Sequence, residues 1–318
     1  MNPYFGADLL TFFPLFFSRL ARFITGDLPL SEAAPDEVQI AVLVLVALSC
    51  ACIGVFLVLT KMTMLANALS HTILPGLVIA YLMSVALLSS LDLQALLWAS
   101  LITGLLTVSA TQLSTYLFKL QEDASIGLVS TTMVAIGVIL VTLFTRSTHL
   151  GVEAVMGNVD ALHPSDVRLV LGIFCIIAPL IALFFKEFKI IAFDSPFART
   201  QGFSPQLWRY ILMFLTAMTV IGAFRAVGIL LVLSLLVGPV LTARLFTHRL
   251  KFLILAAAAL GSGASCLSVA LCRHCLSVYH TPLSTAGILS TLLSLIYALS
   301  LLFVFVTREN RLYKNRGV

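Results

Sequence analysis

The sequence has few charged residues. They make up 10% of the 318 residues, against roughly a quarter in ordinary globular proteins. Hydrophobic residues account for 60% of the chain. This balance excludes a soluble fold, because too few charges remain to cover a surface in water. A helix that crosses a bilayer uses about 20 residues, so the apolar share allows about nine spans and leaves little for a soluble domain.

Other features are scarce or absent. The six cysteines lie mostly inside apolar stretches without paired spacings, so no disulfide framework follows from them. The net charge of +5 does not indicate nucleic-acid binding, because the basic residues fall at the ends of apolar runs, where membrane topology explains them better. The chain has no G-x-x-x-x-G-K-[ST] phosphate loop, which excludes nucleotide hydrolysis of that kind.

The apolar runs predict an all-α polytopic membrane helix bundle of about eight to nine spans, with broken or re-entrant helices. The candidate spans are residues 38–60, 65–88, 93–117, 126–144, 167–185, 207–222, 227–246, 252–272 and 285–306. Residues 207–246 are also compatible with one full helix and one short re-entrant piece. Basic residues concentrate on one side if every run crosses, which predicts an extracytoplasmic N-terminus and a cytoplasmic C-terminus.

The chain divides into an N-terminal extension (1–37), a transmembrane domain (38–307) and a basic cytoplasmic tail (308–318). In the extension, the apolar run is too short to span, and Arg19 and Arg22 follow it at helical spacing. This pattern is typical of an interfacial amphipathic helix outside the cytoplasm. The extension lacks the features of a removed signal peptide. An acidic patch ends it, consisting of Asp27, Glu32, Asp36 and Glu37.

A polar segment, residues 67–76, opens the second span. Met64, Asn67 and His71 are three and four residues apart and therefore share one helical stripe. Thioether, amide and imidazole groups together suit a first-row transition metal. Pro75 removes an amide donor and predicts a bend near His71. The alternative is structural: Met64 fills the core, Asn67 caps the helix and His71 satisfies a carbonyl freed by Pro75.

Two further segments interrupt the apolar pattern. In residues 193–202, Asp194 or Ser195 is able to cap a short cytoplasmic helix with Pro196 in its first turn. Such a helix suits the docking of a soluble partner, although an ordinary interfacial helix has the same composition. In residues 222–228, glycines predict a break between two spans, and Arg225 is interpreted as an interfacial residue.

A possible outer metal cluster consists of Cys272, His274, Cys275 and His280. Thiolate and imidazole ligands suit zinc or ferrous iron, but a single C-x-x-C without a second pair is a weak signal, and free cysteines are common apolar residues. A further set of polar residues follows the fourth span and is expected to form either a solvated loop or a surface that receives cargo. It comprises Glu153, Asp160, His163 and Asp166.

Four ordered segments together resemble one family. Residues 67–76 are similar to the D-A-L-S-H-A-V-L-P-G signature of the ABC-3 family, the permease subunits of bacterial zinc, manganese and iron ABC importers. Residues 193–202 resemble its F-D-x-x-x-A-x-x-x-G segment, residues 227–243 its V-G-x-L-L-V…P-x-x-x-A helix, and residues 122–127 a cytoplasmic turn. The likeness covers roughly residues 38–307.

The resemblance implies a membrane permease subunit of an ATP-driven importer of Mn, Zn or Fe in the bacterial inner membrane, which forms half of an alternating-access pathway. It also implies a cytoplasmic ABC ATPase dimer, a second permease subunit and an extracytoplasmic metal-binding protein as partners. Asn67 and His71, beside Met64, would line the metal path, and Asp194, Ala198 and Gly202 would couple to the ATPase. The metal would be cargo, with no cofactor bound permanently.

The chain departs from the family pattern at Asn67, where aspartate is usual. An amide offers only a dipole to a divalent cation, so a carboxylate is expected from the partner; a heterodimer is favoured, and a homodimer is possible. Other classes are an ion-coupled secondary transporter, which should show acidic residues inside spans, and a permease for a metal chelate such as cobalamin or a siderophore. An intramembrane serine enzyme near Ser265 lacks an activating histidine within a span.

Overall fold

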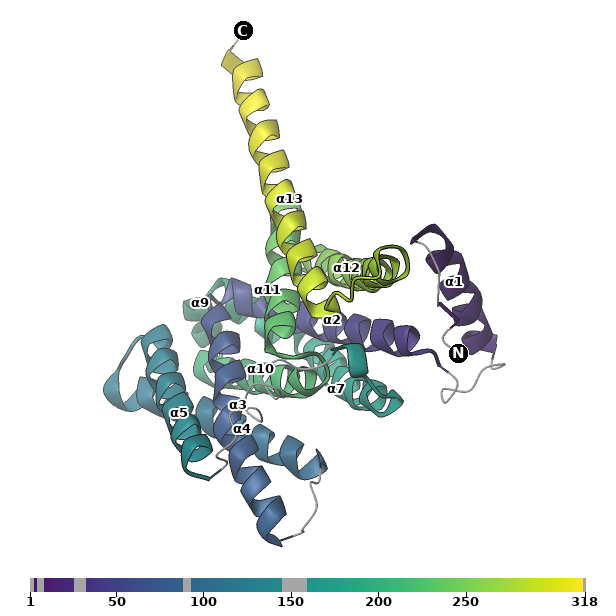
Figure 1. Cartoon of the computed structure of the whole chain (residues 1–318). Helices are drawn as coiled ribbons and strands as arrows, with labels where there is room; N and C mark the ends of the chain where they lie inside the picture. The colour runs from purple at the N-terminus through teal and green to yellow at the C-terminus, as the bar shows by residue number, and fades with distance from the viewer. Residues whose placement is uncertain (1–2, 5–8, 26–32, 88–92, 145–158, 317–318) are drawn as a thin grey trace.

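The computed structural model describes residues 3–4, 9–25, 33–87, 93–144 and 159–316, and no strand occurs among them (Figure 1). The elements are α1 (Leu9–Thr25), α2 (Pro35–Leu59), α3 (Thr63–Leu87), α4 (Leu93–Phe118), α5 (Glu122–Phe144), the 3-10 helix η2 (Val159–Ala161), α7 (Pro164–Leu183), α8 (Phe185–Phe193), α9 (Ser195–Thr200), α10 (Pro205–Val227), α11 (Ile229–Phe246), α12 (Leu250–Tyr279) and α13 (Thr285–Arg316). The predicted all-α fold is confirmed.

Each predicted span coincides with one helix. Seven of the described helices are long and apolar enough to cross a bilayer, and the apolar part of α11, Leu230–Phe246, is shorter. The predicted break between α10 and α11 falls at Gly228, which has φ 86°. A side chain rarely adopts that backbone conformation, so glycine is the residue expected at this junction. α3 continues through Pro75 as one helix.

Proline and left-handed residues set many of the boundaries. Pro35, Pro164 and Pro205 begin α2, α7 and α10, where a missing amide hydrogen costs nothing because that donor would have no helical partner. Lys61 and Lys119 follow the ends of α2 and α4 with φ 62° and 51°, and so reverse the chain into the next helix. These boundaries are therefore encoded locally.

Helix α2 lies at the centre of the bundle and contacts α7, α11 and α12. Its side chains are buried on almost every side; Leu43, Ile53 and Phe56 are completely enclosed. At Gly54, a Cβ would lie 2.3 Å from the carbonyl oxygen of Leu236, so α2 and α11 touch through their backbones. Close approach at small residues is a usual way for membrane helices to pack, since lipid supplies no hydrophobic force between them.

Contacts between helix ends divide the molecule into two ends. At one end, the start of α2 lies against η2, the last turns of α12 and the start of α13. At the other end, the last turns of α2 contact α8, and the start of α5 contacts the start of α10. Successive long helices thus run in alternating directions, as the sequence predicted.

The two terminal parts are both helical. α1 extends beyond the predicted apolar run, and Tyr4 and Phe12 beside it are buried with their rings 4.9 Å apart. The tail that the sequence suggests as a separate segment continues α13 as far as Arg316. In Figure 1, α13 projects from the rest of the bundle and carries the C-terminus at its far end. Asp27, Glu32 and Glu153 lie outside the described residues.

Candidate functional site

The predicted metal-path residues form an exposed stripe on α3. Met64 is 62% exposed, and Asn67 and His71 are exposed as well. The opposite face of the helix is buried in the chain's own core, through residues that include Leu65, Leu69 and Thr72. The stripe therefore points away from the subunit's interior and is available to a cavity or a partner.

The stripe by itself is an incomplete metal site. It offers one thioether, one amide and one imidazole, and no group of three or more His, Cys, Asp or Glu side chains comes together in the part of the chain that the structure describes. A divalent ion in such a path would need further ligands from another chain, from a carrier or from water.

The outer cysteine and histidine residues do not assemble into a metal cluster, so that prediction is wrong for the described structure. α12 stays helical through Tyr279, and at 100° per residue Cys272 and His274 point to nearly opposite sides. The Cys272 thiol donates a hydrogen bond to the Leu283 carbonyl oxygen at 2.9 Å. The His274 ring packs edge-on to Tyr279, with centroids 6.3 Å apart, and His280 ends the helix in a left-handed conformation.

A polar network occupies this outer end instead. The Gln39 amide donates to Asp160 Oδ1 at 2.9 Å and to Thr285 Oγ1 at 3.0 Å, and the Thr285 hydroxyl donates to Asp160 at 2.6 Å. Arg273 forms an ion pair with Asp36. A cavity of about 270 Å³ lies between these groups. The network joins α2, η2, α12 and α13, so Asp160 belongs to a helix-joining contact rather than to a freely solvated loop.

The short polar helix predicted after the fifth span is α9. Asp194 caps it by accepting a hydrogen bond from the Phe197 amide at 3.0 Å, and Pro196 lies in its first turn. Ala198 is completely buried, whereas Phe197 is 49% exposed. Gly202 has φ 82° and open space around it, so it is required there for its backbone conformation and not for close packing.

An aromatic cluster anchors the segment that carries α9. Phe188 on α8 lies 5.4 Å from the Phe56 ring of α2 and 5.4 Å from the Trp208 ring of α10. Phe184 also contacts Trp208, at 5.1 Å. Such ring pairs contribute about 0.5–1.5 kcal/mol each beyond area burial. α8 and α10, which flank α9 in the chain, are thus fixed to each other and to the central helix.

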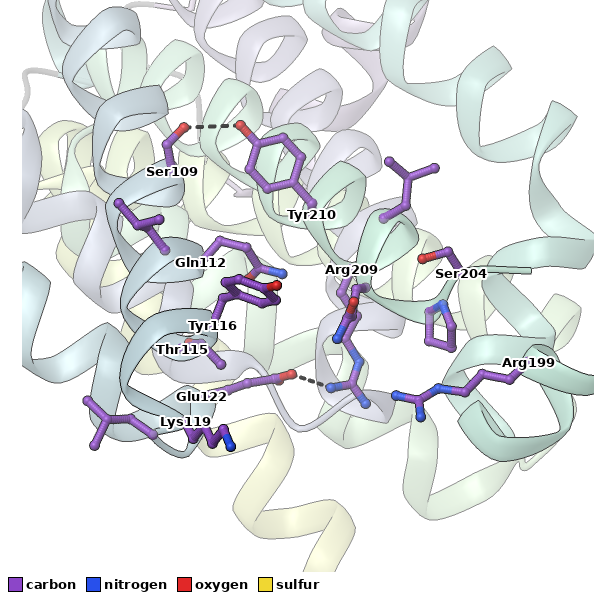
Figure 2. A pocket seen from close by; sticks show the side chains of 15 residues that line it. Ser109, Gln112, Thr115, Tyr116, Lys119, Glu122, Arg199, Ser204, Arg209 and Tyr210 are labelled. Atoms are coloured by element: carbon purple, nitrogen blue, oxygen red, sulfur yellow. Dashed lines mark hydrogen bonds and ion pairs between the residues drawn. The ribbon is translucent and has the colours of Figure 1, made fainter. Parts of the chain in front are cut away.

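A pocket that the sequence did not predict lies beside α9. It has a volume of about 890 Å³ and is bounded by the end of α4, the start of α5, α9 and the start of α10. Figure 2 shows Glu122 in an ion pair with Arg209, and Ser109 hydrogen-bonded to the Tyr210 hydroxyl at 3.0 Å. The available sequence signal was the presence of Ser109 and Gln112 inside an apolar span.

Comparison with known proteins places the chain in a family. The family model described as the ABC 3 transport family matches residues 37–304. A "Probable metal transport system membrane protein" of Chlamydia trachomatis is 37% identical over 96% of this chain and 94% of that protein. The "Manganese transport system membrane protein MntD" of Bacillus subtilis is 38% identical over 70% of this chain and 78% of its own length.

A solved structure shares the fold. The structure titled "PsaBC from Streptococcus pneumoniae in complex with Fab" superposes with a TM-score of 0.69 at 24% identity, and the match covers 88% of this chain and 95% of the other. With the spanning helices, the family match and the full-length relatives, these findings show that the chain is a membrane-spanning transport protein and belongs to the ABC 3 transport family.

Proposed function

We propose that this chain is the permease subunit of an ATP-driven importer of a divalent transition-metal ion, Mn, Zn or Fe, and forms half of the translocation path. The exposed α3 stripe carries the proposal, because it presents soft and borderline ligands outward from an otherwise apolar helix. The printed names of the relatives, which refer to metal and manganese transport, support the same substrate class.

The path is completed by a second permease subunit. His71 and Met64 offer neutral ligands, and Asn67 contributes an amide where a carboxylate would attract the cation more strongly. A non-identical partner that supplies the carboxylate is therefore favoured over a second copy of this chain. The ion is cargo that passes between the two stripes as the subunits alternate between outward-open and inward-open arrangements.

Energy enters through α9. The basic residues of the connections place α9 in the cytoplasm, with the N-terminus outside and the C-terminus inside a bacterial inner membrane. Phe193 and Phe197 are exposed there, at the edge of the capped helix, and suit a groove on a separate ATPase dimer. An extracytoplasmic metal-binding protein delivers the ion to the opposite end.

The test is metal uptake by a His71→Ala variant, with His248→Ala as the matched control, because His248 is also exposed but lies between α11 and α12. The chain is purified with its native partners and reconstituted in vesicles, and uptake of each radiolabelled ion is measured after ATP is added. We expect His71→Ala to lose at least tenfold in uptake and His248→Ala to match the parent protein.

Membrane insertion and ATPase co-purification should stay unchanged in both variants, which separates a path defect from misfolding. Normal uptake by His71→Ala would overturn the path assignment. Uptake by the chain without any ATPase would instead favour a secondary transporter, and uptake of a metal chelate but not of the free ion would favour a chelate permease.

A further inference from the structure

We propose that the pocket between α4, α5, α9 and α10 binds the head group of an anionic phospholipid from the cytoplasmic leaflet. This inference rests on the orientation given under the proposed function, but not on the identity of the cargo. The pocket has a volume of about 890 Å³, which exceeds what a bare inorganic ion needs. Figure 2 shows that its polar side chains project from several elements into one space.

Charge makes the pocket suited to an anion. Its lining carries three cations, Lys119, Arg199 and Arg209, against one carboxylate, that of Glu122. Glu122 pairs with Arg209, and in Figure 2 the guanidinium groups of Arg199 and Arg209 point toward one another. Two like charges that converge in this way are stabilised when an anion lies between them, and guanidinium groups fit phosphate oxygens bidentately.

The backbone holds Lys119 at this edge. Lys119 follows the last residue of α4 and adopts φ 51°, a left-handed conformation that costs a residue with a side chain roughly 1–2 kcal/mol. A glycine would adopt it without that cost. The turn places the lysine between α4 and α5, on the rim of the pocket that faces the proposed cytoplasmic side.

The rest of the lining is apolar and continues along the membrane-spanning part of α4. Leu113, Tyr116 and Leu207 line the pocket and are each more than half exposed in this chain. From Ser109 to Lys119 the lining follows α4 for about 15 Å, at 1.5 Å per residue. A ligand that satisfies both parts has an anionic head and an apolar tail.

The membrane supplies such a molecule at this depth. The cytoplasmic leaflet is rich in anionic lipids, and basic pockets between spans on that side bind acidic head groups. The alternative occupant is an acidic segment of the ATPase, because α9 forms one wall. A protein segment that docks from the cytosol has no reason to follow an apolar groove up α4, so the lipid is favoured.

The experiment measures lipid retention on the purified full-length chain by native mass spectrometry. The protein is offered phosphatidylglycerol or phosphatidylcholine with identical acyl chains. We expect the parent protein to retain phosphatidylglycerol at least tenfold better than phosphatidylcholine. The double variant Lys119→Gln, Arg199→Gln should lose this preference, since each cation near a lipid surface contributes measurably to binding. Lys186→Gln, Lys189→Gln removes two exposed cations of α8 outside the pocket and should change nothing.

Further arms keep the result decisive. The variant Arg199→Lys preserves charge and should keep the preference, which guards against a folding defect in the double variant. Equal retention of the two lipids, or an unchanged preference in the double variant, would overturn the proposal. Displacement of phosphatidylglycerol by millimolar inorganic phosphate would assign the pocket to a free anion. Loss of ATPase co-purification with unchanged lipid retention would assign it to the partner protein.

Discussion

Replacing Gly54 with alanine tests whether α2 and α11 are held in backbone contact. The new Cβ would lie 2.3 Å from the Leu236 carbonyl oxygen and 3.3 Å from the Val240 Cγ2 atom. A backbone carbonyl within a helix is unable to rotate away, so the two helices must separate by roughly 1 Å to regain ordinary contact distances. The separation would also loosen the neighbouring core, in which Ile53 and Leu57 are completely buried.

The expected cost follows from two opposing effects. Overpacking a well-packed core typically costs about 1–3 kcal/mol. Alanine in place of a helical glycine returns about 0.5–1 kcal/mol. The net effect of Gly54→Ala is therefore a loss of about 1–2 kcal/mol. At about 2–4 °C per kcal/mol for a chain of this size class, the thermal midpoint should fall by several degrees.

The assay is the thermal midpoint of the purified chain in detergent, followed by loss of the monodisperse peak in gel filtration. Gly263→Ala is the matched control, because Gly263 also lies within a long helix but a Cβ there meets no atom within 4 Å. The control should be neutral or slightly stabilising. If both variants shift the midpoint equally, the inferred backbone contact between α2 and α11 is wrong.

Two further predictions concern the ends of the molecule. Asp194→Ala should cost about 1 kcal/mol of α9 stability, seen as roughly fivefold faster amide exchange over residues 195–200, whereas Asp194→Asn keeps the cap and the slow exchange. Burial, followed by the hydrogen bond to Glu37, raises the pKa of Tyr4 above its ordinary value of 10.0. A raised folded-state pKa gives stability that is complete below pH 10 and is lost as the pH rises further, so α1 should exchange faster above pH 10. Tyr4→Phe should flatten that pH dependence, and an unchanged profile would contradict it.

The positions of the helices could be predicted because they depend on local patterns. Apolar runs of sufficient length, a proline at the first turn and a glycine between two runs are each readable in one short window of sequence. α9 is the clearest example, since Asp194 and Pro196 together encode its start. Regularity of this kind needs no knowledge of the partner helices.

The pairings between helices could not be predicted from the same patterns. Asp36 and Glu37 look like part of one acidic patch, yet both are buried, and they pair with Arg273 and Arg19 respectively. Membrane topology placed the members of the Asp36–Arg273 pair on one side of the bilayer. It did not choose between them and other charges on that side, because the choice depends on how the helices pack.

The outer metal cluster failed for a related reason. Close spacing in the sequence suggested that Cys272 and His274 share a site, but a helix turns neighbouring residues to different faces. Sequence spacing predicts a cluster only when the secondary structure of the segment is known. The α3 stripe was predicted on helical spacing, and its three residues do share an exposed face.

The contacts also indicate how α9 and the α3 stripe are joined. α10 begins a few residues after α9 and packs on both α3 and α4. Its first turns contact α8 through Trp208 and α5 through Arg209, and α5 lies directly beside α3. Moving α9 alone would break the Phe188–Trp208 contact, so α8, α9 and α10 should move as one unit. A displacement at α9 would then reach α3 through α10 and α5, while the tight backbone contact at Gly54 keeps α2 and α11 together.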